Sequence, residues 1–224
     1  MASTAEDLFD AIEAEDAARV RAILADEPGL GEARDEHGVS ALMRALYRFQ
    51  PTLVEAVREH VGRLDVFEAA TVGDTDRLRE LLRGDAALAT TYSADGFTPL
   101  HFAAFFGHPD VAELLLGNGA EVDALGRGFM TGTALHSATA ASHAEIVRML
   151  VEAGAKPNLR QEGGATPLHA AVANADIASI DALLAHGADP SLTKDDGESI
   201  LERAEQRGDE ATIERIRAAL QAAP

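Results

Sequence analysis

The sequence of 224 residues contains no cysteine and no tryptophan, and its only lysines are Lys156 and Lys194. Without cysteine, neither a disulfide framework nor a thiolate metal site can form. No stretch of about 18 apolar residues is present, so no membrane-spanning helix is expected. The acidic N-terminal stretch lacks the basic segment and apolar run of a signal peptide. These absences predict a cytoplasmic protein.

Basic residues are scarce, because 19 Lys and Arg stand against 38 Asp and Glu, for a net charge of −19. The charge is spread evenly, with −6 in residues 1–64, −7 in 65–132 and −6 in 133–224. Nucleic acid and anionic membrane surfaces are therefore disfavoured as partners, since both need clustered Lys and Arg. Solubility explains such a charge, and a basic protein partner is the sharper alternative. The excess of arginine over lysine and the abundant alanine suggest a bacterial coding sequence.

What the sequence does contain is an internal repeat, which should be sought before other signals. One phrase is clearest at Thr98–Ala104 and Thr166–Ala171, with a degraded copy at Thr133–Ala138. Four further copies are weaker, and the last two of them lack the opening pair: Ser40–Ala45, Ser199–Ala204, Leu8–Ala11 and Val66–Ala69.

The register of the repeat is set by one apolar anchor in each of seven units, namely Leu8, Leu42, Val66, Leu100, Leu135, Leu168 and Leu201. The steps between anchors are 34, 24, 34, 35, 33 and 33 residues. Three residues after every anchor the sequence has alanine, and twelve and fifteen residues after it the sequence is apolar. Columns that agree in all seven units exclude coincidence.

Local chemistry predicts that each unit is a helix, a turn and a second helix. Thr or Ser opens five of the units and can accept from the free N–H groups of a starting helix, while Pro99 and Pro167 suit the first helical turn. The +12 and +15 positions share one face of the second helix. Glycines such as Gly119 and Gly154 then end that helix. Because no unit can bury its apolar face alone, neighbouring units must stack.

The sequence resembles ankyrin repeats over about residues 5–222. The resemblance is carried by the phrase T-P-L-H-x-A-A, by the 33-residue period and by the glycine-containing segment that ends the second helix. The resemblance implies an all-α solenoid of about seven helix-turn-helix units, with short β-hairpin fingers projecting from it. It also implies that partners bind the fingers and the inner-helix face. We expect residues 1–224 to form a single domain and an elongated monomer. Departures from the pattern are Phe9, Phe67 and Glu202, which stand where the repeat has histidine.

Three histidines, His101, His136 and His169, occupy the same register, one in each of three units. The resemblance implies that each ties its helix to the adjacent turn by hydrogen bonds. A metal site is disfavoured, because the histidines lie on separate units and share no helix face. We expect no metal and no other cofactor.

Catalysis has little support in the sequence, and we assign no catalytic residue. The segment Gly126–Gly132 resembles a phosphate-binding loop only in its glycines, and an enlarged finger explains it better. We therefore predict a non-enzymatic scaffold for a protein partner. The alternative is an enzyme or small-molecule receptor with a site in residues 50–65 or 125–132. A deep pocket with convergent polar groups would favour the alternative, and a shallow apolar groove would favour the scaffold.

The step of 24 residues between Leu42 and Val66 is about nine short of the period. Both helices of that unit look intact, so the connector must carry the deficit. We expect the finger at residues 60–65 to be shortened or missing, which would leave a gap where a partner enters. A frayed second helix is the other explanation.

Four of the ten aromatic residues fall at positions that the resemblance places on the binding groove. We predict a partner groove formed by Tyr47, Phe97, Phe105, Phe106, Phe129 and Met130, with surrounding carboxylates favouring a basic partner. Contiguous exposed aromatic residues usually mark an interaction site. The alternatives are that these rings pack on neighbouring units, or that the missing finger folds the chain over them.

Overall fold

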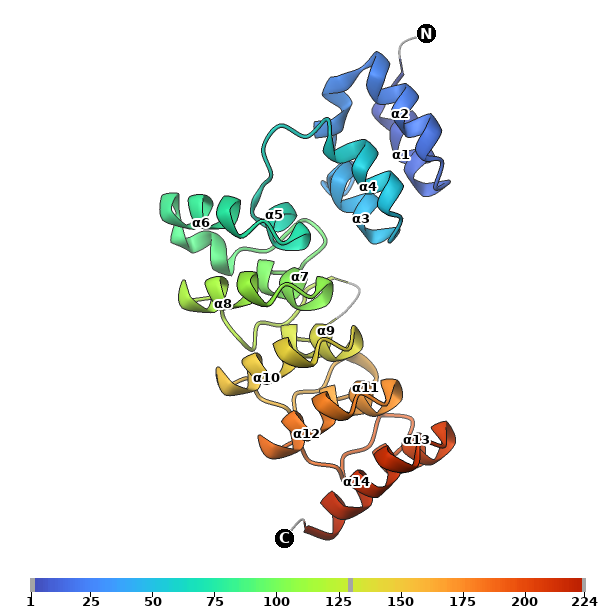
Figure 1. Cartoon of the computed structure of the whole chain (residues 1–224), viewed down its shortest axis with the longest axis vertical. Coiled ribbons are helices and arrows are strands. Elements are labelled where there is room, and N and C mark those ends of the chain that lie inside the picture. The colour runs from blue at the N-terminus through green and yellow to red at the C-terminus, as the bar shows by residue number, and fades with distance from the viewer. Residues whose placement is uncertain (1–2, 129–130, 223–224) are drawn as a thin grey trace.

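The computed structural model describes residues 3–128 and 131–222, which form an elongated stack of helix pairs with the two termini at opposite ends (Figure 1). The first helices of the seven pairs are α1 (Ala5–Glu13), α3 (Ala41–Tyr47), α5 (Val66–Val72), α7 (Pro99–Phe106), α9 (Ala134–Ala140), α11 (Pro167–Asn174) and α13 (Ile200–Arg207). The second helices are α2 (Ala17–Asp26), α4 (Pro51–Arg58), α6 (Thr75–Gly84), α8 (Pro109–Gly117), α10 (Ala144–Glu152), α12 (Ile177–Ala185) and α14 (Glu210–Ala222). The predicted all-α stack of about seven helix pairs is confirmed.

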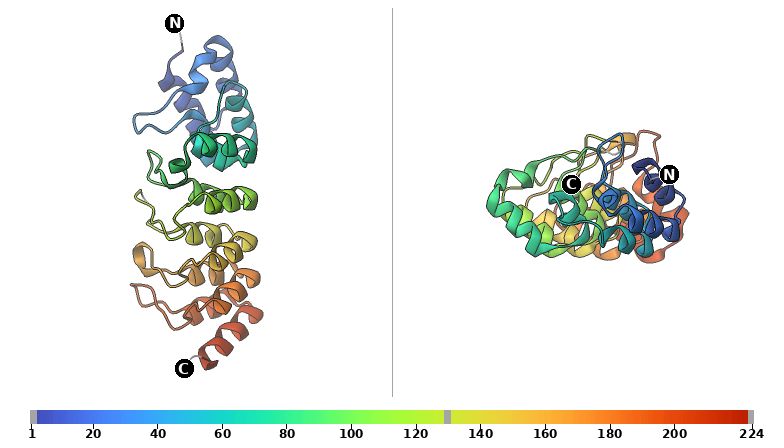
Figure 2. Two further views of the ribbon diagram at one scale, coloured as in Figure 1. Left: turned by 90° about the vertical axis from the view of Figure 1, so that its left-hand side faces the viewer. Right: turned by 90° about the horizontal axis from the view of Figure 1, so that it is seen from above.

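Short loops project from one side of the stack, and these are the fingers (Figure 2). The part of the chain that the structure describes has no β-strand in them, only isolated antiparallel bridges at Arg34–Ser40 and Thr193–Ser199. Several fingers are closed instead by one backbone hydrogen bond between residues four apart, such as Ser93 N–H to Phe97 O at 2.9 Å. The expected β-hairpins are therefore tight turns, because each finger is too short for a ladder. Three short 3-10 helices, η1 (Pro28–Glu32), η2 (Ala86–Thr90) and η3 (Glu162–Gly164), lie in the connectors.

Threonine and histidine together begin the first helices of the fourth, fifth and sixth pairs. In α7, the backbone N–H of Thr98 donates to His101 Nδ1 at 3.3 Å, and the Thr98 hydroxyl lies 2.8 Å from the same nitrogen. Because Nδ1 accepts, Nε2 carries the proton and donates to the carbonyl of Gly132, 3.1 Å away in the next finger. This capping arrangement recurs in α9 and α11. Each histidine therefore bonds the threonine that precedes its helix, as the resemblance implied, and His101 also bonds the next finger.

The predicted core columns are buried along the whole stack. All seven alanines at the +3 position are 0% exposed, which lets first helices approach closely. Six of the seven anchors are also buried, while Leu201 of the last pair is half-buried. In the +12 and +15 columns only Val54 of α4 and Leu81 of α6 are half-buried. Both of these residues lie at the junction between the second and third pairs.

A further column, seven residues after each anchor, was not identified from the sequence. In every pair this residue has positive φ and turns the chain between the two helices: Glu15, Phe49, Gly73, Gly107, Ser142, Ala175 and Gly208. Glycine adopts this conformation without steric cost, whereas a bulky side chain there is strained. Phe49, with φ 54°, is the largest side chain at the position.

The junction between the second and third pairs has no finger. Residues 59–65 run directly from α4 to α5, and α4 and α6 lie apart, unlike the second helices on either side (Figure 1). The sequence predicted a gap at this missing finger. The fingers on either side of the gap approach each other and make it narrower. An added Cβ at Gly38 would lie 3.2 Å from the Cβ of Ala94, so fingers 33–40 and 91–98 are adjacent. The first two pairs thus fold over the third pair toward the fourth.

Candidate functional site

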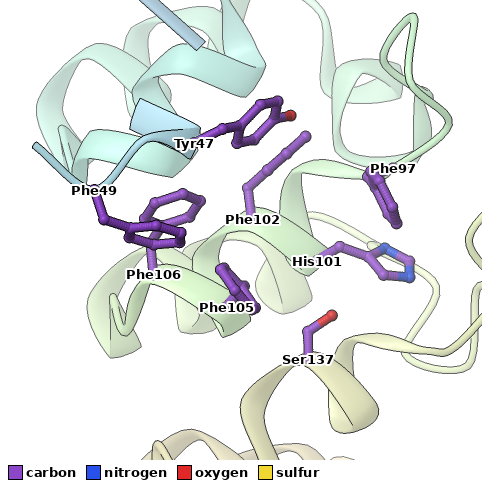
Figure 3. A pocket seen from close by; sticks show the side chains of 8 residues that line it. All are labelled: Tyr47, Phe49, Phe97, His101, Phe102, Phe105, Phe106 and Ser137. Carbon is purple, nitrogen blue, oxygen red and sulfur yellow. The ribbon is translucent and has the colours of Figure 1, made fainter. Parts of the chain in front are cut away.

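One pocket of about 270 Å³ lies where the second and fourth helix pairs meet (Figure 3). Its lining comes from the end of α3 and the following turn, from α7 with the residue before its cap, and from α9. We call it the aromatic pocket, and it is lined by Tyr47, Phe49, Phe97, His101, Phe102, Phe105, Phe106 and Ser137. None of these side chains carries a charge at neutral pH, and six of the eight are aromatic rings of Phe or Tyr.

Three rings form one side of the aromatic pocket. Phe49 stacks on Phe106 with ring centroids 5.9 Å apart, and it lies 6.0 Å from Phe105 in a tilted arrangement. Phe105 and Phe106 meet edge to face at 5.3 Å. Phe49 is nevertheless 64% exposed. The strained turn of the second pair therefore holds a large exposed ring against α7, and most of that ring is left uncovered.

The opposite wall is buried. Phe97 is only 6% exposed, and its ring packs edge to face on Phe102 at 5.9 Å and lies 5.7 Å from His101. Phe102 in turn contacts Phe67 of α5 at 6.1 Å. The prediction that Phe97 occupies an exposed groove position is therefore wrong. Its ring is part of the wall, because it packs against Phe102 and His101 and lies beside Gly128 of the next finger.

Tyr47 joins α3 to the finger that precedes α7. Its hydroxyl donates to the carboxylate of Asp95, which also accepts from the Ser93 hydroxyl at 2.5 Å. Burial and then the neighbouring Asp95 carboxylate raise the pKa of Tyr47, so the phenol stays protonated and keeps donating. This bond fixes the distance between the second pair and the finger.

Two arginines near the aromatic pocket are held by carboxylates. Arg44 lies 3.1 Å from Glu13 and 3.3 Å from Asp35, while Arg48 lies 3.2 Å from Glu13 and 2.8 Å from Glu15. Their positive charges are thereby balanced within the first two pairs. They do not give the pocket a positive potential.

A second hollow, of about 250 Å³, lies where the absent finger would project. We call it the polar cleft, and it shares Tyr47 with the aromatic pocket. Its charged side chains are Arg34, Asp65 and Asp95. Arg34 donates to Asp65 at 3.0 Å and to the carbonyl of Gly38 at 3.1 Å. The predicted gap between fingers therefore survives as a small cleft.

The structure brings together four of the six residues predicted for the groove: Tyr47, Phe97, Phe105 and Phe106. Phe129 and Met130 lie outside the described residues. Sequence reasoning missed Phe49, Phe102, His101 and Ser137. The +7 column would have found Phe49, because three of the seven units have glycine there. That these residues bind a partner stays a prediction.

Two backbone N–H groups at the start of the segment 125–132 are used within the fold and are not free to bind an anion. The N–H of Gly126 donates to Gly132 O at 2.9 Å, and that of Arg127 donates to Gly96 O at 2.8 Å. The guanidinium of Arg127 lies over the ring of Tyr92, 3.6 Å from its centroid. This part of the chain therefore has the hydrogen bonding of a finger.

The buried histidines are neutral; Nδ1 of each contacts its capping threonine, but only His101 also has a hydrogen-bond partner for Nε2, since Nε2 of His136 and of His169 has none among the residues that the structure describes. Burial lowers the pKa of His101, His136 and His169, to about 4 in the case of His136. In residues 3–128 and 131–222, no three His, Asp or Glu side chains come together in a way that could hold a metal. Over the same residues, no helix is both long and apolar enough to span a membrane.

Comparison with known families identifies repeats in the middle of the chain. Residues 95–127 match the model of the ankyrin repeat, and residues 125–194 match a model of three ankyrin-repeat copies. These ranges contain the two clearest copies of the repeated phrase. The family whose models match is therefore the ankyrin repeat, which the repeated phrase and its period also resemble.

Several curated proteins are similar to parts of the chain. Palmitoyltransferase Hip14 of Drosophila melanogaster is 33% identical over 62% of this chain and 21% of its own length. The probable E3 ubiquitin-protein ligase XBOS33 of Oryza sativa is 43% identical over 37% of this chain and 16% of its own length. Ankyrin repeat and SAM domain-containing protein 6 of Mus musculus is 34% identical over 48% of this chain and 12% of its own length. The chain thus matches about a fifth or less of each of these relatives.

Proposed function

We propose that this chain, in which residues 95–194 match ankyrin-repeat models, is a non-enzymatic scaffold that binds a protein partner at the aromatic pocket and the adjoining fingers. Ankyrin repeats are in general protein-interaction modules. The observation that carries the proposal is the concentration of aromatic residues. Six of the ten in the sequence line this one pocket, and Phe49 is 64% exposed there.

The placement of Phe49 supports an interaction role better than a packing role. A bulky residue at positive φ costs about 1 kcal/mol or more, and such strain concentrates at functional sites. A ring that served the core would be covered, whereas most of this ring is open to solvent. Aromatic residues are preferred interface anchors, because they bury much area at little entropy cost.

The alternative, an enzyme or small-molecule receptor, has less support. The aromatic pocket of about 270 Å³ is smaller than typical ligand pockets of about 300–1,000 Å³ and lacks convergent polar groups. Its one ionisable hydroxyl, on Tyr47, is bonded to Asp95. A site for a single partner side chain fits these dimensions better.

Several finer expectations remain proposals that rest on the sequence: a single domain over residues 1–224, a monomer in the cytoplasm, a basic partner and a bacterial origin. The curated relatives described above are eukaryotic, so the bacterial origin rests on composition alone. The catalytic activities named in two of those relatives are not transferred, because the chain matches only 21% and 16% of their lengths.

The proposal is tested by the double substitution of Phe105→Ala and Phe106→Ala, with Phe49→Gly as a variant that removes only the exposed ring. Proteins captured from a lysate of the source organism are quantified by mass spectrometry for each variant. We expect the same partner to be lost from both variants, with at least about 2 kcal/mol of binding free energy removed by the double substitution.

The matched control is Ala175→Gly, which makes the same kind of change in the turn of the sixth pair, where no residue lines the aromatic pocket. It should retain the partner in full. Thermal melting of each variant shows whether it is folded. If folded Phe49→Gly and folded double variant capture the same proteins as the wild type, the aromatic pocket is not the interface.

A further inference from the structure

The aromatic pocket and the polar cleft lie side by side, with the ring of Tyr47 common to both. The cleft exists because the connector at residues 59–65 is too short to form a finger. The two hollows differ in chemistry. The first is lined by aromatic rings, and the second contains the carboxylates of Asp65 and Asp95.

The aromatic pocket selects an apolar side chain by desolvation. Two of its polar groups are already used, because the Tyr47 hydroxyl donates to Asp95 and His101 Nε2 is bonded to Gly132 O, and the hydroxyl of Ser137 is the one other polar side-chain group in the lining. A polar group placed there would lose its hydration without a replacement hydrogen bond. The volume of about 270 Å³ accommodates one large side chain rather than several.

The polar cleft selects a cation by charge. Asp95 accepts from two hydroxyl groups, Tyr47 and Ser93, which satisfy its oxygens without neutralising the charge. Asp65 is paired with Arg34, and its other oxygen accepts from the N–H groups of Phe67 and Glu68. Two carboxylates and one guanidinium therefore leave about one negative charge in the cleft. Arg44 and Arg48 do not offset it, since Glu13, Glu15 and Asp35 hold them.

We propose that the site binds an extended segment of a partner protein which carries one large apolar side chain and, within about four residues of it, an arginine or lysine. The apolar side chain enters the aromatic pocket, and the cation enters the polar cleft beside Asp95. A spacing of two residues suits an extended chain, because alternate side chains lie about 7 Å apart, close to the width of one ring. This inference rests on the proposed function and names the chemistry of the partner.

The experiment is a selection of random peptides displayed on phage, with the full-length protein immobilised at low ionic strength. Enriched peptides are synthesised and their affinities measured by fluorescence anisotropy. We expect them to share an aromatic, leucine or methionine residue with an arginine or lysine within four positions. Phe49→Gly should weaken binding at least about tenfold, since it removes one side of the aromatic pocket.

The cation is tested by a double-mutant cycle. Asp95→Asn keeps an oxygen that can accept from Tyr47 but removes the charge, and citrulline in the peptide removes the positive charge of arginine. Each change alone should weaken binding about fivefold at low salt and reduce the salt dependence, whereas both together should cost little more than one. The control Glu162→Gln removes a charge from a different finger and should leave the affinity unchanged.

Three outcomes are distinguishable. The inference is supported if the enriched peptides carry the apolar residue with a nearby arginine or lysine, and if the effects of Asp95→Asn and of citrulline on binding are coupled. Enriched peptides that lose affinity in Phe49→Gly but show no cation preference, or additive effects in the cycle, overturn the inference and leave the proposed function intact. Peptides that bind Phe49→Gly and the double Phe105 and Phe106 variant as tightly as the wild type, or no enrichment at all, overturn both.

Discussion

The junction between the fourth and fifth helix pairs and the junction between the second and third are built in different ways. In the former, the finger lies between the pairs, His101 donates to the carbonyl of Gly132, and α8 packs beside α10. In the latter, no finger is present and α4 and α6 lie apart. The side-chain hydrogen bonds across it include Ser40 to Glu68 at 2.6 Å and Arg34 to Asp65 at 3.0 Å. Connector length therefore decides whether second helices stack on one another.

The shortened junction also changes which pairs meet. Each repeat of a solenoid normally contacts only its neighbours. Here Phe49 and Tyr47 of the second pair contact Phe105, Phe106 and Asp95 of the fourth, past the third pair. The aromatic pocket is a product of this contact, so the irregular part of the repeat creates the candidate site and the regular part supports it.

The largest expected difference between the two junctions lies in their second helices. Leu115 of α8 is fully buried, whereas Leu81 of α6, at the same register, is half-buried because α4 does not cover it. Leu115→Ala should lower the free energy of unfolding by about 2–5 kcal/mol, and Leu81→Ala by clearly less. Urea denaturation measures both. Equal losses would show that the second and third pairs stack as tightly as the others.

The pH dependence of stability should separate the two junctions next. The caps of the fourth to sixth pairs use histidines whose pKa is lowered by burial, so the unfolded chain takes up protons that the folded chain does not. For His136 the stabilisation is complete above pH 6.5 and is lost as the pH falls toward about 4, by up to about 1.4 kcal/mol per pH unit. Burial raises the pKa of Glu68, which caps the third pair, so its contribution changes with pH in the opposite direction.

The variant His136→Gln isolates this effect, because glutamine at the third helical position can still serve the capping box but does not titrate. Urea midpoints are compared at pH 7 and pH 5 for the wild type and the variant. We expect a smaller loss of stability on acidification in the variant. A loss identical to that of the wild type would mean that His136 does not contribute to the acid sensitivity.

The smallest expected difference concerns the turns at the +7 position. Ala175→Gly relieves a positive φ of 52° and should stabilise the protein by about 1 kcal/mol. Phe49→Gly relieves the same strain but loses the stacking on Phe105 and Phe106, worth about 0.5–1.5 kcal/mol, so it should change stability little. Thermal melting distinguishes them. A marked destabilisation by Phe49→Gly would assign this ring to the core.

Much of the fold was predictable because its signals are short in range. Caps such as Thr98 with His101 involve residues three apart, and the anchor and alanine columns repeat within each unit. The location of the deficit near residues 60–65 followed from counting residues between anchors. Of the residues in the candidate site, the sequence indicated Tyr47, Phe105 and Phe106. These aromatic residues occupy positions that are not required for stacking of the helix pairs, so their presence there points to an interaction site.

The sequence by itself determined the helix pairs, their register and their order, since each depends on hydrogen bonds and packing between residues close in the chain or one period apart. Only the tertiary structure decided how the missing finger is accommodated. That outcome depends on the contacts of Phe49 with Phe105 and of Tyr47 with Asp95, which join different helix pairs. No periodicity encodes a contact that passes over a whole repeat, so the pairing of an aromatic pocket with a polar cleft could be seen only once the chain was folded.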